Sequence, residues 1–161
     1  EMSRNGSDDM KKPIAVLFAF LLLLLSSCTS LPEPDAHELA DRIISEQTAR
    51  EFDEADSDMI SILFGLDVND FSDYAVYYSK EPASADIVVI FKSDKKETLD
   101  SAKDILEEFR KSRIEDFKGY APEEAAKLEE AKVISKGKYD IFVVMPDNEA
   151  VQKAINTEFE G

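Results

Sequence analysis

The sequence predicts an α+β domain, a two- or three-layer α/β sandwich built on a four-stranded, largely antiparallel sheet. Residues 86–92 are apolar at every interior position, which is typical of a strand that is covered on both faces. Two further strand patterns flank Lys136-Gly137-Lys138, a spacing that indicates a tight hairpin. Helical patterns separate and follow these strands, so helices are available to cover the sheet.

The first half of the chain begins with N-terminal helices. Asp35 has the character of an N-cap, and Glu38 lies three residues later in capping-box position. In chain order, the predicted elements are a helix over 36–52, an acidic connector over 51–58, a short helix over 59–64 and a strand over 73–80. Gly65 suits the left-handed turn that ends the short helix.

The second half alternates strands with longer helices. In chain order, the predicted elements are a strand over 86–92, a helix from 93 to about 118, a helix over 122–130, strands over 132–135 and 139–145, and a helix to about 159. Gly119 ends the long helix. Pro122 occupies the first position of the next helix, where its missing N–H costs nothing.

The two strand-rich regions suggest an internal duplication. Residues 86–91 resemble residues 140–145, and each run is preceded by another strand and followed by an aspartate and a helix. Strand–strand–helix would then occur twice, with both following helices against one face. Chance similarity between short buried strands explains the same pattern. If the duplication holds, the second face is covered by the N-terminal helices or left for a partner.

The N-terminal stretch reads as an export signal. Lys11 and Lys12 precede the apolar run 14–25, which is too short to span a bilayer. Leu25, Ser26, Ser27 and Cys28 then resemble the lipobox of bacterial lipoproteins, in which the cysteine is acylated and becomes the mature N-terminus. We therefore expect a location outside the cytoplasm, lipid-anchored to the outer face of the bacterial cell membrane. The alternative is a signal-anchor helix with an incidental cysteine.

These signals divide the chain into three parts. Residues 1–27 are expected to be a leader and signal peptide with the true start at Met10, residues 28–35 the lipidated cysteine and a proline-containing tether, and residues 36–161 one globular domain. The leader holds three basic and three acidic residues, so the net charge of −16 rests entirely on the exported part. Nucleic acid is disfavoured as a partner because phosphate binding needs clustered Lys and Arg.

A calcium site is one interpretation of the acidic connector. The candidate ligands are Asp53, Glu54, Asp56 and Asp58, with Asp67 and Asp70 as further candidates. The EF-hand pattern fails here, since counting from Asp53 or Asp56 puts no glycine at position six and no glutamate at position twelve. Acidic residues at the start of a helix explain the same stretch.

Catalytic residues are not apparent. Cys28 is the only cysteine and His37 the only histidine, so neither a Ser-His-Asp site, a Cys-His site nor a His/Cys zinc site can be assembled. His37 is expected to be a surface residue. A hydrolase with paired carboxylates remains the enzymatic alternative, although no pair stands out among 35 acidic residues.

Tyrosines offer a candidate interaction surface, because tyrosine is enriched at interfaces. The candidates are Tyr74, Tyr77, Tyr78, Tyr120 and Tyr139. Packing within or around the sheet explains them equally well. The leading hypothesis is a non-catalytic module that binds a protein, peptide or envelope component, with no cofactor and with the membrane as its anchor.

Several segments together resemble a family of uncharacterised lipoproteins of Gram-positive bacteria, catalogued only as a domain of unknown function. The segments are 119–123 (Gly-Tyr-Ala-Pro-Glu), 136–139 (Lys-Gly-Lys-Tyr), 141–144 (Ile-Phe-Val-Val) and 89–92 (Val-Ile-Phe-Lys). The resemblance covers roughly residues 36–159 together with the lipobox, and it lies in the order and spacing of the segments. It implies a small α/β lipoprotein domain and brings no catalytic residues.

Overall fold

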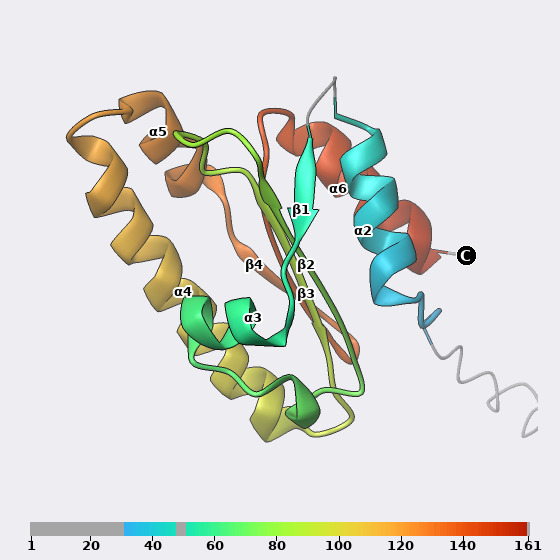
Figure 1. Cartoon of the computed structure of the whole chain (residues 1–161). Helices are drawn as coiled ribbons and strands as arrows, with labels where there is room; N and C mark the ends of the chain where they lie inside the picture. The colour runs from blue at the N-terminus through green and yellow to red at the C-terminus, as the bar shows by residue number, and fades with distance from the viewer. Residues whose placement is uncertain (1–30, 48–50, 161) are drawn as a thin grey trace, which may run out of the picture. The chain divides into compact units, whose positions relative to one another are not determined.

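A five-stranded antiparallel sheet forms the centre of the structure, a computed structural model that describes residues 31–47 and 51–160 (Figure 1). The strand order across the sheet is β1-β2-β3-β5-β4. The strands are β1 (Phe52–Glu54), β2 (Asp73–Ser79), β3 (Ile87–Lys92), β4 (Val133–Lys136) and β5 (Tyr139–Val144). The predicted α+β class is confirmed, with helices on both faces of the sheet.

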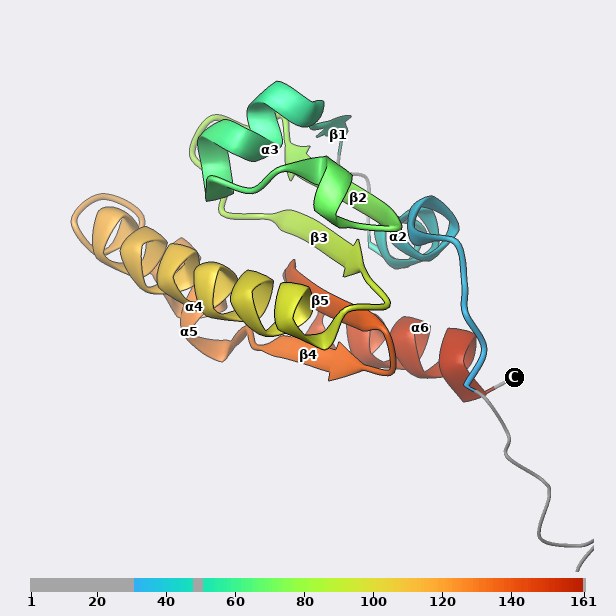
Figure 2. The same cartoon turned by 90° about the horizontal axis from the view of Figure 1, so that it is seen from below.

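One face is covered by the helices from the middle of the chain, as Figures 1 and 2 show. They are α3 (Ser57–Phe64), the short 3-10 helix η2 (Val68–Asp70), the long α4 (Lys96–Lys118) and α5 (Pro122–Glu130). Phe117 and Leu106 of α4 and Phe91 and Phe142 of the sheet are fully buried in this core. The phenyl ring of Phe91 also stacks on Phe71 with centroids 4.5 Å apart.

The other face is covered by the first and last helices, α2 (Ala36–Ser45) and α6 (Asn148–Glu160). Leu39 and Ile43 of α2 and Ile155 of α6 meet the sheet in a second buried core. An ion pair between Arg42 and Glu158 joins the two helices.

The two central strands, β3 and β5, contribute to both cores. Val89 pairs with Phe142 on the α4 face, whereas Val88 pairs with Val143 on the α2 face. Successive side chains of a strand point to opposite faces, so a strand with a core on each side must be apolar at every position. This is the physical reason for the continuous apolar run in residues 87–91.

The predicted turns and caps are confirmed where local chemistry determines them. Asp35 caps α2 by accepting the N–H groups of His37 and Glu38. Gly65 and Gly137 have positive φ angles of 68° and 61°, which glycine adopts without strain. Gly137 forms the tight turn between β4 and β5.

The sheet has one strand more than expected, and the first helix is shorter. We expected a helix over 36–52, but α2 ends at Ser45 and Phe52–Glu54 forms the edge strand β1. Asp53 of β1 pairs with Tyr78 of β2. A three-residue strand has too few positions to show a period of two, and its acidic residues protect the exposed edge against further pairing.

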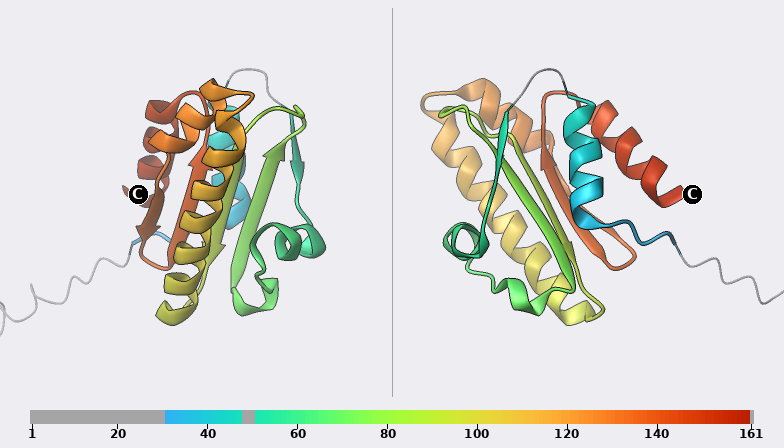
Figure 3. Two further views of the ribbon diagram at one scale, coloured as in Figure 1. Left: turned by 90° about the vertical axis from the view of Figure 1, so that its left-hand side faces the viewer. Right: turned by 45° about the vertical axis from the view of Figure 1, so that its right-hand side comes forward.

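The expected placement of the repeated helices was wrong. The order strand–strand–helix does occur twice, as β2-β3-α4 and β4-β5-α6. However, α4 packs on one face and α6 on the other, as the two cores and the left panel of Figure 3 show. A two-fold axis between β3 and β5 would place both helices on one face, so the two halves are not related by such an axis.

Candidate functional site

Four of the acidic residues proposed for calcium each have a separate protein partner, Glu54 through His37. Asp53 lies 3.3 Å from the ammonium of Lys80, and Asp56 accepts the N–H of Met59 at 2.8 Å as the N-cap of α3. Asp67 caps η2 in the same way, and Asp58 lies in the exposed first turn of α3. Across residues 31–47 and 51–160, no group of three or more His, Cys, Asp or Glu side chains is arranged to hold a metal ion.

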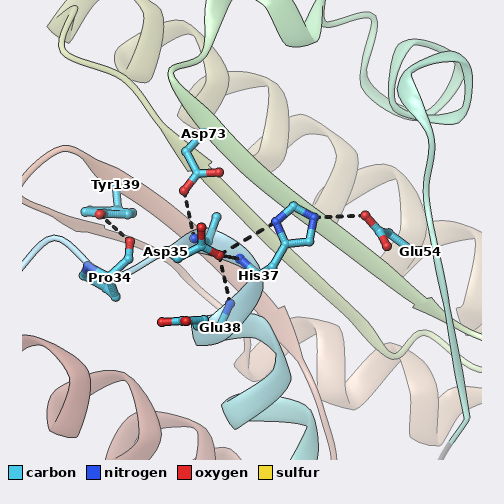
Figure 4. A network of polar contacts seen from close by, with 8 residues as sticks. Pro34, Asp35, His37, Glu38, Glu54, Asp73 and Tyr139 are labelled. Atoms are coloured by element: carbon cyan, nitrogen blue, oxygen red, sulfur yellow. Dashed lines mark hydrogen bonds and ion pairs between the residues drawn. The ribbon is translucent and has the colours of Figure 1, made fainter.

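His37 takes part in a polar network at the start of α2 (Figure 4). Its Nε2 lies 3.0 Å from Glu54 Oε1, and its ring meets the edge of Tyr77 with centroids 6.4 Å apart. The network ties α2 to the edge strand β1. No nucleophilic hydroxyl or thiol is among these contacts, so the geometry suits a structural role.

The tyrosines do not form one surface. Tyr74 and Tyr78 pack against the α4-side core, whereas Tyr77 packs against the α2-side core. Tyr139 is 1% exposed, and Tyr120 is exposed beside Phe117. The proposed tyrosine contact surface is therefore divided among both faces and the interior.

The residues of the predicted lipobox, Leu25, Ser26, Ser27 and Cys28, lie outside the described residues. Within the part of the chain that the structure describes, none of the helices has the length and apolar character needed to cross a membrane.

Residues 31–35, which come shortly after the predicted lipobox, are docked on the domain. We call residues 31–35 the proline segment; it runs beside the β4–β5 turn before α2 begins (Figure 3, right). The Tyr139 hydroxyl donates a hydrogen bond of 2.7 Å to the carbonyl of Pro34. The first N–H of α2, from Ala36, donates to Asp73 Oδ2 at 2.9 Å. These contacts join the segment to β5 and β2.

A charged clamp holds the same segment. The Glu33 carboxylate lies between two ammonium groups, 2.7 Å from Lys138 Nζ and 3.2 Å from Lys92 Nζ. The hydrogen bonds from Lys138, which has the larger effect, and from Lys92 hold the pKa of Glu33 below its ordinary value. In turn, the carboxylates of Glu33 and Asp94 raise the pKa of Lys138. The clamp therefore stays charged at neutral pH, and it weakens when acid protonates Glu33 or strong base deprotonates the lysines.

A pocket of about 290 Å³ lies next to this clamp, between the beginning of α4 and the β4–β5 hairpin. Its lining includes Ser93, Asp94, Lys96, Asp100, Ser135 and Asp140. Asp140 is 1% exposed, although it carries a carboxyl group. Its Oδ1 accepts a hydrogen bond of 2.7 Å from the Ser135 hydroxyl. Its Oδ2 has no hydrogen-bond partner among the described residues. We call this space the Asp140 pocket.

Burial raises the pKa of the Asp140 carboxyl, because a charge is costly to bring into the interior. The Ser135 hydrogen bond and the nearby Lys103 oppose this effect. Lys103 donates to Ser135 Oγ at 3.2 Å, which places an ammonium one hydroxyl away from the acid. Among the described residues, Asp140 Oδ2 is thus a buried acceptor without a hydrogen-bond partner in the lining of this pocket.

A second buried carboxylate lies at the opposite end of the sheet. Asp86, 2% exposed, contacts Lys127 Nζ at 2.5 Å, and the same ammonium lies 2.6 Å from Glu124. Glu124 also accepts the N–H of Ala85 at 2.7 Å. This group links α5 to the start of β3, so its charge is balanced from within the fold.

Neither buried carboxylate was among the site residues predicted from the sequence. Each has a visible signal, since Asp86 and Asp140 are charged residues that begin or interrupt an otherwise apolar strand. A charge in a buried run must have a partner or a function. That signal locates the residue but not its partner, because Lys127 and Ser135 lie on other elements.

The family model described as domain of unknown function (DUF4358) matches residues 46–145, which is well over half of the chain. The chain belongs to this family. The DUF4358 match contains all five strands and α3, α4 and α5, and it spans the Asp140 pocket. Helices α2 and α6, which cover the second face, lie outside the matched residues. No curated protein and no solved structure matches the chain.

Proposed function

We propose that this protein is a lipid-anchored domain on the outer face of the bacterial cell membrane, where it binds a component of the envelope and catalyses no reaction. The observation that carries this proposal is the docked proline segment. The segment starts three residues after Cys28, and three residues span at most about 10 Å. A lipid on Cys28 would then hold the β4–β5 end of the domain close to the lipid headgroups.

The charges of the domain support anchoring by lipid. The net charge of −16 would repel an anionic membrane surface. At the β4–β5 end, the ammonium groups of Lys92 and Lys138 are engaged by Glu33 and Asp94. An acyl chain supplies the attraction that the protein surface lacks, and stable anchoring takes about two chains or equivalent signals.

The polar groups of the Asp140 pocket support a binding role. Among the described residues, the unpartnered buried atom of its lining is the acceptor Asp140 Oδ2, and the Ser135 hydroxyl beside it already donates to the same carboxyl group. Nucleophilic catalysis needs a base whose position is fixed by a third group. His37, the only histidine, lies in the α2 network with Glu54 and is not part of the pocket lining.

Metabolic labelling tests the anchoring. The full chain is expressed in a bacterium that is fed an alkyne-bearing fatty acid, and the cells are then fractionated and treated with protease. We expect the wild-type protein to carry the label, to sediment with membranes and to be cleaved on intact cells stripped of their wall. Cys28→Ser should lose the label, whereas Ser26→Ala, which keeps a small residue before the cysteine, should retain it. Unlabelled wild-type protein in the cytosol would refute the proposal.

A further inference from the structure

The Asp140 pocket has a polar requirement that the described part of the fold does not meet. Asp140 Oδ2 is buried and lacks a partner there, although more than nine in ten buried polar groups in proteins have one. Leaving a buried acceptor unsatisfied destabilises the folded state. A site that keeps such an atom beside an open pocket is suited to a ligand that donates a hydrogen bond.

The charges around Asp140 indicate which donor fits. Lys96 is engaged by Asp100 at 2.5 Å and Lys138 by Asp94 at 2.9 Å, so each lysine that lines the pocket already has a carboxylate. Lys103, on the same helix, donates to Ser135. The pocket offers an anion little free positive charge. Its carboxylates and the net charge of −16 attract cations instead.

The geometry separates an ammonium from a metal ion. A divalent cation such as Ca²⁺ takes six to eight oxygen ligands, and the described residues contain no group of three acidic or imidazole side chains placed to hold a metal. An ammonium carries three donors and needs one strong acceptor with other oxygens nearby. Asp140 supplies the strong acceptor, and Ser93 and Asp94 supply oxygens in the same lining.

We infer that the Asp140 pocket binds a primary ammonium group, whose N–H donates to Asp140 Oδ2 in a charge-assisted hydrogen bond. The cation binds without any covalent step. If Asp140 holds a proton in the empty pocket, binding releases that proton to solvent. The inference supplies a ligand class for the proposed binding role.

Two sources can present this chemistry. A small amine can enter from solution, and a phospholipid with an amino headgroup can present it from the bilayer. Only the second source rests on the proposed anchoring, because it needs the β4–β5 end to lie at the membrane. The first can be tested whether or not the chain is lipidated, so the two ideas can fail separately.

The titration of Asp140 provides the measurement. The full chain in phosphatidylglycerol bicelles is labelled with ¹³C at the aspartate carboxyl carbons, and the Asp140 signal is assigned by its loss in Asp140→Asn. The pKa is read from about pH 3 to about pH 8, spanning the ordinary value and a raised one. It is measured again with ethanolamine in the buffer, with ethylene glycol as the uncharged counterpart, and with phosphatidylethanolamine in the bicelle.

We expect ethanolamine to lower the pKa of Asp140 by at least about one unit. This shift means that ethanolamine binds the ionised carboxylate about tenfold more tightly than the protonated acid. Ethylene glycol should leave it unchanged. A shift with phosphatidylethanolamine as well assigns the ammonium to a lipid headgroup, and a shift with free ethanolamine alone assigns it to a soluble ligand. No shift in either arm overturns the inference.

A second readout does not depend on the titration. Ethanolamine should move the amide signals of Ser93 and Gly137, and Asp140→Asn should raise the half-saturating concentration at least about tenfold. Asp104→Asn is the matched control, because it removes a carboxylate from an exposed position on α4 outside the pocket. Equal binding by wild type and Asp140→Asn overturns the inference.

Discussion

The two ends of the sheet bury one carboxylate each, and they treat it in opposite ways. At the α5 end, Asp86 meets the ammonium of Lys127 at 2.5 Å. At the β4–β5 end, the hydrogen-bond partner of Asp140 among the described residues is the neutral hydroxyl of Ser135, at 2.7 Å. Both residues are at most 2% exposed, so the difference lies in their partners and not in their burial.

This difference separates structural from functional use of a buried acid. A carboxylate paired with an ammonium inside the fold has its charge balanced, and removing the partner exposes the cost of the buried charge. A carboxylate with a free oxygen beside a pocket can be completed from outside. At the α5 end, the buried ion pair therefore stabilises the contact between α5 and β3. At the β4–β5 end, the buried carboxyl group is suited to binding a ligand.

Replacing Lys127 with methionine should have the largest effect on stability. Lys127→Met keeps the long aliphatic chain but removes the ammonium from Asp86 and Glu124. Breaking a buried ion pair by removing one partner costs about 3–5 kcal/mol. Urea unfolding followed by circular dichroism should show this loss at an unchanged m-value.

Lys111→Met is the matched control for that loss. Lys111 is 62% exposed and reaches Glu108 at 3.4 Å, so its removal should cost less than about 1 kcal/mol. If Lys127→Met destabilised the protein no more than Lys111→Met, the ion pair at the α5 end would not stabilise the fold. The contrast between the two ends would then disappear.

The sequence predicts elements best where local chemistry sets their limits. Pro122 at the first position of α5 defines where that helix begins, and Gly137 determines the hairpin turn. The edge strand β1 was missed because its pairing with β2 joins residues more than 20 positions apart. The face that α6 covers was predicted wrongly because an apolar helical stripe does not encode which side of a sheet it meets.

The candidate site shows the same limit. The Asp140 pocket combines the loop around Ser93, the first turns of α4 and the β4–β5 hairpin. The hairpin follows the other two parts by some 40 residues in the chain. The sequence shows an aspartate within an apolar strand, and no local pattern shows what faces it. Docking of the proline segment was likewise invisible, because Glu33 and Lys138 lie far apart in the chain.

Removing the Tyr139 hydroxyl should have an intermediate effect at the β4–β5 end. Tyr139→Phe keeps the buried ring and removes the hydroxyl, which donates to Pro34 and also interacts with Lys92; the hydrogen bond to Pro34 is worth about 1 kcal/mol. Amide hydrogen exchange in residues 31–36 should speed up while exchange in β3 stays unchanged. Tyr120→Phe, at a tyrosine that is 62% exposed, should change neither. Slow exchange in Tyr139→Phe would show that the Glu33 clamp alone holds the segment.

Of the three substitutions, Asp140→Asn should have the smallest effect on the free energy of unfolding at neutral pH. The size of its effect should depend on pH. Because burial raises the pKa of Asp140, the native state holds a proton that the unfolded chain has already lost between the two pKa values. This contribution to stability is full below the unfolded pKa and disappears as pH rises through the folded one. The wild type should therefore gain stability over Asp140→Asn as the solution is acidified.

The measurement is urea unfolding of both proteins at a series of pH values, with Asp104→Asn measured alongside to subtract the loss of an exposed carboxylate from α4. A stability difference between wild type and Asp140→Asn that instead grew with pH would show that the carboxylate gains from being charged in the folded state. Asp140 would then have an internal cation that balances it, as Asp86 does. The pocket beside it would lose its reason to bind an ammonium.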